Sequence, residues 1–307
     1  MDKFAVMARH ALPLQRMGQA AMNRRKLVEI SATRMMFLAT AFVTTLVLLI
    51  GVGLYLKARP VLATNSLGEL LFSSAWRPSQ GQFGLFPFIM GTLWVTALAG
   101  AIAVPLSLLN ALYLAEYAPS KVRAAVKPAI DLLAGIPPVV YGVWALLALS
   151  IGGLGIGFNV LAGGIVLAVM VIPVITSVSE EVFKTVPQDV KEASLALGAT
   201  RWETAKHVVI RSSLPGLAAA AILGFSRAFG ETMAVLMVVG NIARVPHSPL
   251  DPAYPLPALI ANNYGEMMSV PLYDSALLLA ALVLFLVILA FNLMARLTLR
   301  RIQRRWA

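Results

Sequence analysis

The sequence predicts an all-α integral membrane protein with six transmembrane helices. Hydrophobic residues make up 59% of the 307 residues and charged residues only 13%, whereas soluble domains use about 25% charged residues. Six apolar runs follow one another, and each approaches or exceeds the roughly 20 residues that a helix needs to cross a bilayer. Lys and Arg gather in alternate connections between these runs, as they do in multi-pass proteins.

The first half of the chain supplies three of these runs. Residues 1–34 are basic and precede every apolar run, and the first run, residues 35–56, is too long for a cleaved secretory signal. We expect a cytoplasmic segment followed by an uncleaved helix. Residues 57–87 contain Gly, Ser, Pro and Gln and predict an external loop. The second and third helices are expected over residues 88–114 and 128–149.

The third run carries a signal that breaks helices. Gly135 is followed two residues later by Pro137 and Pro138, and proline cannot donate a helical hydrogen bond. We expect a break or a sharp kink at this point. Pro137, Pro138 and the nearby Tyr141 are therefore candidates for a gate, with a kink that serves packing alone as the alternative.

The second half of the chain alternates between apolar runs and polar connections. One of these connections contains six prolines, which predict a loop with little regular secondary structure. The expected order is a fourth helix over residues 160–178, a charged cytoplasmic segment over 179–213, a fifth helix over 214–240, the proline-rich periplasmic loop over 241–274, a sixth helix over 275–294 and a basic tail over 296–307.

The distribution of positive charge predicts the orientation. Six spans place both termini on one side of the membrane, and 20 of the 25 Lys and Arg residues lie on that side. Cytoplasmic connections carry the excess of Lys and Arg, so both termini are expected in the cytoplasm. This asymmetry also accounts for the net charge of +11, and nucleic-acid binding is not needed to explain it.

Two opposite charges lie within the expected fifth helix. Arg227 and Glu231 are four residues apart, a spacing that places both side chains on one face of a continuous helix. A charge at the membrane centre costs roughly 2.5–3.5 kcal/mol even on insertion scales, so such residues normally face protein or a polar path. With Thr232 they are candidates for the substrate pathway. The alternative is an ion pair that only fixes helix packing.

Several classes of chemistry are excluded. The chain has no Cys, which rules out disulfides, thiolate zinc sites and thiol nucleophiles. The three His residues are scattered along the chain, so no His-based metal cluster is expected. No G-x-x-x-x-G-K-[ST] motif is present. We expect no catalytic residue, no metal and no cofactor, and any ATP hydrolysis must occur in a separate subunit.

The charged segment predicts two short cytoplasmic helices. Apolar residues recur at helical spacing from Phe183 to Leu197, and Gly198 is suited to end that helix. Thr200 and Glu203 have the spacing of a capping box at the start of a second helix. A rigid hairpin with an apolar stripe is suited to docking into a groove on another protein.

The same segment resembles a known family. Glu192-Ala193-Ser194, followed after three residues by Gly198, is similar to the Glu-Ala-Ala…Gly loop of binding-protein-dependent ABC importer permeases. The family's following Ile-x-Leu-Pro is replaced by Val208-Val209-Ile210-Arg211. The resemblance implies a type I ABC importer permease (MetI-like) fold. It also implies that Glu192, Ala193 and Gly198 belong to a coupling helix in a cleft of the ATPase.

Residues 133–142 and 226–235 resemble the phosphate-specific permeases of the PstC type. The match covers most of residues 85–300, and thus a permease core of five helices over residues 88–295. It implies phosphate transport across the bacterial inner membrane. The implied partners are a second permease of the PstA type, an ATPase dimer of the PstB type and a periplasmic phosphate-binding protein of the PstS type.

Three alternatives to a phosphate importer stay open at this point. The first is a permease for another oxyanion such as molybdate or sulfate. The second is an ion-coupled secondary carrier that uses Arg227 and Glu231 as an ion relay; the lack of a detectable internal repeat speaks against it. The third is a membrane scaffold that only signals phosphate status.

Overall fold

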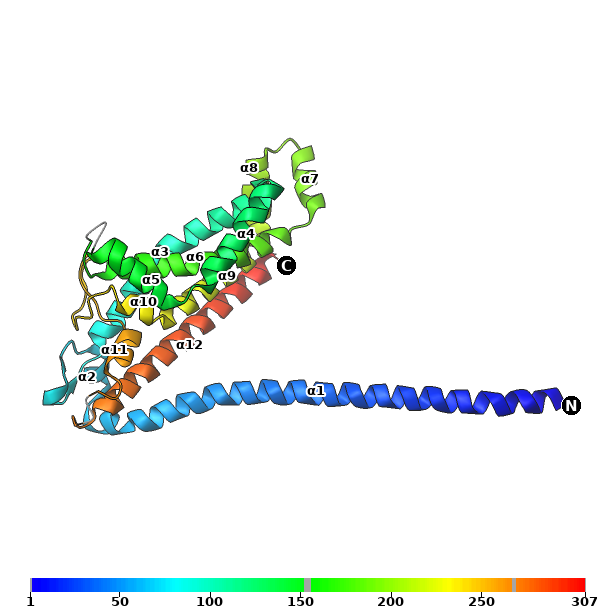
Figure 1. Cartoon of the computed structure of the whole chain (residues 1–307), viewed down its shortest axis with the longest axis horizontal. Helices are drawn as coiled ribbons and strands as arrows, with labels where there is room; N and C mark the ends of the chain where they lie inside the picture. The colour runs from blue at the N-terminus through cyan, green and yellow to red at the C-terminus, as the bar shows by residue number, and fades with distance from the viewer. Residues whose placement is uncertain (1, 152–155, 267–268, 307) are drawn as a thin grey trace. The chain divides into compact units, whose positions relative to one another are not determined.

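The computed structural model describes residues 2–151, 156–266 and 269–306, and helices dominate it (Figure 1). Within these residues, five helices are long and apolar enough to cross a membrane, and a bent pair of helices is a candidate for a sixth span. The prediction of an all-α membrane fold is confirmed. The chain divides into two units, residues 1–53 and 54–307, which are described separately.

The described residues of the first unit all lie in one long helix, α1 (Asp2–Thr64). This helix continues into the second unit, where its last residues lie. The helix runs through both the expected basic segment and the expected first span. It ends at Thr64 rather than near residue 56, and its candidate span is Glu29–Thr64.

The expected external loop over residues 57–87 is largely ordered. After α1 it contains α2 (Leu67–Phe72) and an antiparallel hairpin of β1 (Trp76–Arg77) and β2 (Gln82–Phe83), joined by the 3₁₀ turn η1 (Pro78–Gln80). Trp76 pairs with Phe83 in this hairpin. Both rings pack into an apolar cluster that also contains Phe88 and Tyr273, so the hairpin is fixed by burial of its aromatic residues.

Two parallel helices form the centre of the second unit. They are α3 (Phe86–Leu112), which continues into the π-helical turn η2 (Tyr113–Tyr117), and α6 (Val160–Lys184). At Gly164 an added Cβ would lie 2.7 Å from a Leu98 methyl carbon, so the glycine is needed for the close approach of the two helices. Small residues commonly allow such contacts between membrane helices.

The third span is broken, as the sequence predicts. It consists of α4 (Ser120–Gly135), α5 (Pro138–Ala145) and the π-helical turn η3 (Leu146–Ile151), and the two halves meet at 93°. It begins at Ser120 rather than near residue 128. Pro137, in an extended conformation, separates the halves.

The expected fifth helix over residues 214–240 is wrong at both ends. The candidate span runs from Arg201 to Gly230, through α8 (Arg201–Thr204), the π-helical turn η4 (Ala205–Val209) and α9 (Ile210–Gly230). Glu231 is extended, and a separate short helix, α10 (Met233–Leu236), follows.

The break also means that Arg227 and Glu231 do not share a helix face. The Glu231 carboxylate accepts a hydrogen bond from the backbone N–H of Ala234 at 3.3 Å. A side chain that caps the next helix in this way competes with continuation of the previous one.

The expected proline-rich loop over residues 241–274 contains a helix, α11 (Leu256–Asn263). In the part of the loop that precedes α11, the Asp251 carboxylate accepts hydrogen bonds from the backbone N–H groups of His247 and Ser248. These bonds, that from His247 above all, hold the pKa of Asp251 below its usual value. The last helix, α12 (Tyr273–Trp306), extends through the residues expected to form a separate tail after position 295.

Candidate functional site

The charged end of α9 is the first part of the candidate site. Arg227 lies in the last turn of α9, and its side chain is exposed in the isolated chain. Among the residues that the structure describes, no carboxylate forms a salt bridge with it. An accessible guanidinium that is not neutralised by a nearby carboxylate can bind an anion.

Glu231 and Thr232 occupy the break between α9 and α10. Besides capping α10, the half-buried Glu231 lines a narrow crevice that also contains Thr92 and Thr96 of α3. The Thr232 hydroxyl donates to the Gly230 carbonyl at 3.3 Å. Polar side chains of α3 and of the non-helical break after α9 therefore meet in this crevice.

The broken third span lies against this region. The Tyr141 hydroxyl donates to the Leu133 carbonyl at 2.7 Å and so ties α5 to the end of α4 across the bend. An added Cβ on Gly142 would lie 2.7 Å from the Met237 Sδ and 3.1 Å from the Ala234 Cα, which shows how closely α5 packs beside α10. The broken third span and the short helix α10 that follows the end of α9, which the sequence analysis treated separately, are thus brought together.

The sequence analysis missed a polar contact between α9 and α12. The Ser226 hydroxyl donates to the Asn292 side-chain carbonyl at 2.9 Å, and the Asn292 amide donates to the Ile288 carbonyl. A signal was present, because Asn292 is a polar residue inside an apolar run long enough to span.

The charged segment forms the predicted hairpin at the opposite end of the helical core from α2 and α11 (Figure 1). Its first helix, α7 (Gln188–Ala196), begins after Pro187, so Phe183 belongs to α6 and not to this helix. Gly198 has a φ of +89°. The capping box of Thr200 and Glu203 is present at the start of α8.

The two other residues of the predicted coupling helix are exposed on α7. Ala193 is exposed, and Glu192 is exposed while its carboxylate accepts a hydrogen bond from the Gln188 amide at 3.2 Å. The Ser194 and Thr204 hydroxyls lie 3.0 Å apart and hold α7 to α8.

An ion pair that the sequence analysis missed joins this hairpin to α3. Lys191 Nζ of α7 lies 2.6 Å from Glu116 Oε1 of η2, with side-chain exposures of 13% and 17%. Both residues line a pocket of about 270 Å³ together with Tyr117 and Arg201. Nothing in the sequence spacing links positions 116 and 191, so only the fold reveals the pair.

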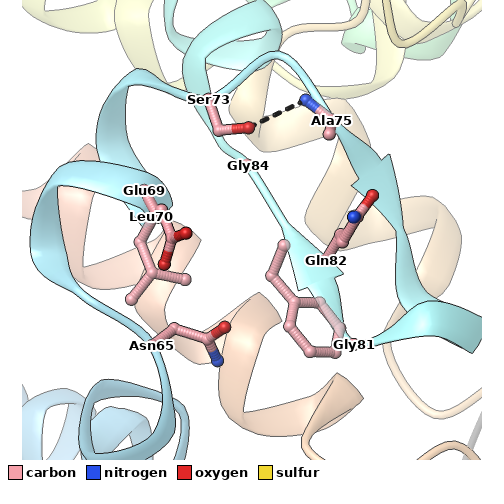
Figure 2. A pocket seen from close by; sticks show the side chains of 9 residues that line it. Asn65, Glu69, Leu70, Ser73, Ala75, Gly81, Gln82 and Gly84 are labelled. Carbon is pink, nitrogen blue, oxygen red and sulfur yellow. Dashed lines mark hydrogen bonds between the residues drawn. The ribbon is translucent and has the colours of Figure 1, made fainter.

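A second pocket, of about 120 Å³, lies at the end of the core that carries α2 and the β1–β2 hairpin (Figure 2). Asn65, Glu69 and Gln82 provide polar groups around it. The Ser73 hydroxyl accepts a hydrogen bond from the backbone N–H of Ala75 at 3.1 Å. In the described part of the chain, no group of three or more His, Cys, Asp or Glu side chains is arranged to hold a metal ion.

Comparison with known sequences matches the chain to one family of transport proteins and to named permeases. The family described as "Binding-protein-dependent transport system inner membrane component" matches residues 103–304. The "Phosphate transport system permease protein PstC" of Xylella fastidiosa (strain 9a5c) is 40% identical over 261 residues, covering 77% of this chain and 80% of that protein. The protein of the same name from Mesorhizobium japonicum is 36% identical over 323 residues, covering 96% and 97%.

The solved structures support the fold. A structure of the MetNI methionine ABC transporter in inward-facing conformations matches with a TM-score of 0.58, covering 71% of this chain and 95% of the matched chain. The sequence identity is 20%, so this likeness concerns the fold alone.

Proposed function

Because the chain belongs to the family of binding-protein-dependent transport system inner membrane components, we propose that it is the permease subunit of an ATP-driven importer of inorganic phosphate. It is a multi-pass inner-membrane transport component and not an enzyme. One observation carries the proposal: relatives named as phosphate permeases are 36–40% identical over 77% or more of the chain.

Arg227, Glu231 and Thr232 would line the substrate pathway. Arginine offers planar, multidentate donors that match phosphate oxygens, and Arg227 is accessible beside the break after Gly230. Non-helical backbone at membrane depth is tolerated only inside protein or beside a water-filled path. The exposed guanidinium and the nearby break therefore support a polar route along this part of the chain.

Glu231 would contribute to selectivity among oxyanions. A carboxylate accepts hydrogen bonds and cannot donate them, so it favours hydrogen phosphate, which carries a proton, over fully deprotonated sulfate. Its position beside Thr92 and Thr96 supports this role. The bend at Pro137 and Pro138, tied by the Tyr141 hydroxyl, would act as a gate next to the same segment.

The permease would form its pathway with a second permease of the PstA type. An ATPase dimer of the PstB type would receive the coupling helix α7, with Glu192, Ala193 and Gly198 as coupling residues. A periplasmic phosphate-binding protein of the PstS type would dock on the face that carries α2 and α11. With 20 of 25 basic residues on the side of the termini, both termini would be cytoplasmic.

Co-purification followed by reconstitution into liposomes tests the proposal. The complex should accumulate radiolabelled phosphate only when ATP and the binding protein are both present, and phosphate-loaded binding protein should stimulate ATP hydrolysis. Uptake driven by an ion gradient without the ATPase would instead support a secondary carrier. Uptake of sulfate or molybdate in place of phosphate would reassign the cargo.

A further inference from the structure

The Lys191–Glu116 pair lies where the coupling hairpin meets the membrane core. Lys191 is in the middle of α7, whereas Glu116 belongs to η2, the π-helical end of α3. Their charged atoms are 2.6 Å apart. In the described part of the chain, this is the only hydrogen bond or ion pair that joins α7 to η2.

The side chains of this pair are more shielded from solvent than those of the Lys127–Glu181 pair. Its side chains are 13% and 17% exposed, whereas those of the Lys127–Glu181 pair, which joins α4 to α6, are 46% and 61% exposed. Shielded charges attract one another more strongly and are screened less by salt. Removal of one partner leaves the other as an unpaired, largely buried charge.

The Glu116 side of the pair is held rigidly in place. The Arg123 side chain of α4 donates to the Leu114 carbonyl at 2.8 Å and to the Ala115 carbonyl at 3.0 Å. These bonds satisfy carbonyls next to Glu116 and fix the end of α3. A displacement of Lys191 would therefore move α3 itself and would not only bend the end of this helix.

One side of the pair borders a pocket. A pocket of about 270 Å³ lies beside it, between α7, η2 and the start of α8. Close apolar packing between α7 and η2 is therefore interrupted at this point. Because α7 has no buried residue, the ion pair, and not a buried apolar contact, is what joins α7 to η2 here.

We propose that the Lys191–Glu116 ion pair transmits movement of the coupling hairpin to α3. Glu116 and Lys191 are positioning residues for transport, because they act through α3 and do not contact the cargo. The inference rests on the proposed function, since it assigns the path by which the ATPase moves the permease. α3 also contributes Thr92 and Thr96 to the crevice beside Glu231, so its displacement reaches the proposed pathway directly.

Charge exchange in the full reconstituted transporter tests this inference. Lys191→Glu and Glu116→Lys should each lower the phosphate taken up per ATP hydrolysed by about tenfold or more, because each places like charges at the contact. The double variant, with the charges exchanged, should restore the ratio to within about threefold of wild type. Lys121→Glu, at an exposed residue of α4, makes the same charge change and should leave the ratio unaltered.

A distance measurement separates this inference from the proposed function. Because the chain has no native Cys, spin labels can be placed at the exposed residues Ala196 of α7 and Tyr113 of η2. The distance between them should stay constant between nucleotide-free and ATP-bound complexes of the wild type and should change in Lys191→Glu.

The outcomes are distinct. A wild-type complex that hydrolyses ATP but moves no phosphate refutes the proposed function, and the label distance still decides the inference. A label distance that changes with ATP as much in the wild type as in Lys191→Glu overturns the transmission role. A single-charge variant with a normal uptake ratio overturns it as well, as does a double variant that fails to recover although it assembles normally.

Discussion

Arg227 presents a planar cation at the end of α9, and among the described residues no carboxylate forms a salt bridge with it. Its availability for an anion therefore depends on the geometry of the guanidinium as well as on its charge. Lysine keeps the charge but provides a compact point donor, so it cannot reproduce bidentate contacts.

Arg227→Lys should consequently lower phosphate uptake by roughly 10- to 100-fold, which corresponds to the loss of one charge-assisted hydrogen bond of about 1.5–3 kcal/mol. Initial uptake rates in vesicles, normalised to the amount of permease, measure the effect. Arg211→Lys, a matched change at an exposed position near the start of α9, should be neutral. Normal uptake by Arg227→Lys would remove Arg227 from the substrate pathway.

Glu231 has a structural role and a proposed selective role, and one substitution separates them. Glutamine keeps a side-chain carbonyl that can accept from the Ala234 N–H, so Glu231→Gln should preserve the break before α10. The amide can also donate to a deprotonated oxyanion. We therefore expect a lower preference for phosphate over sulfate, measured by competition during uptake, at an unchanged level of protein in the membrane. An unaltered preference would contradict the selective role.

At the scale of elements, the hairpin of α7 and α8 depends on the backbone conformation of one residue, Gly198. Gly198 has a φ of +89°, and an added Cβ would meet no atom within 4 Å. A substitution there is therefore unfavourable because of backbone conformation and not because of a clash. Asparagine tolerates the left-handed region far better than β-branched residues do.

Gly198→Val should abolish ATP-driven uptake while the protein remains in the membrane, because the left-handed conformation costs about 1–2 kcal/mol for an ordinary residue and more for valine. Gly198→Asn should keep most of the activity. Uptake and immunoblots of the membrane fraction measure the two effects. If Gly198→Val took up phosphate as well as Gly198→Asn does, the angle between α7 and α8 would be unimportant for coupling.

At the scale of the whole molecule, the second unit carries its two candidate partner-binding regions at opposite ends. The hairpin of α7 and α8 lies at one end of the helical core, and α2 with α11 lies at the other (Figure 1). The proposed pathway, at the end of α9, lies along the core that joins them. A displacement of the hairpin can therefore affect the proposed pathway only through the helices between them. α3 and α6 pack together closely and are suited to transmit this displacement.

The orientation of these ends can be measured with introduced cysteines, since the native chain has none. A membrane-impermeant maleimide added to intact spheroplasts should label Ser248→Cys, in the expected periplasmic loop, and should not label Ala307→Cys until the membrane is broken. Prior reaction of intact cells with a permeant maleimide should block both. Labelling of Ala307→Cys from outside would reverse the proposed orientation.

Much of the fold could be predicted because membrane insertion imposes a simple rule. A helix must hide its backbone polar groups within itself, so long apolar runs such as residues 160–178 predict helices directly. The break at Pro137 was predictable for a local reason, the missing N–H of proline. The hairpin around Gly198 was predictable from its cap signals, which act over a few residues.

The end of α9 could not be predicted in the same way. Arg227 and Glu231 have helical spacing, and apolar residues resume at Met233, so Gly230 by itself is only a weak signal for the break. The break depends on the Glu231 carboxylate capping α10 and on α5 packing beside α10 through Gly142. The Lys191–Glu116 pair was also missed, because its partners are far apart in sequence.

By itself, the sequence determined that this is a helical membrane protein with a broken third span and a capped helical hairpin, and its motifs indicated the family. These features follow from hydrophobicity, from proline and from helix capping, each of which acts within a few residues or along a single helix. Only the tertiary structure decided that α9 ends before Glu231, that α5 packs beside α10, and that Lys191 binds Glu116. Those contacts join distant segments, so they exist only once the helices have packed together.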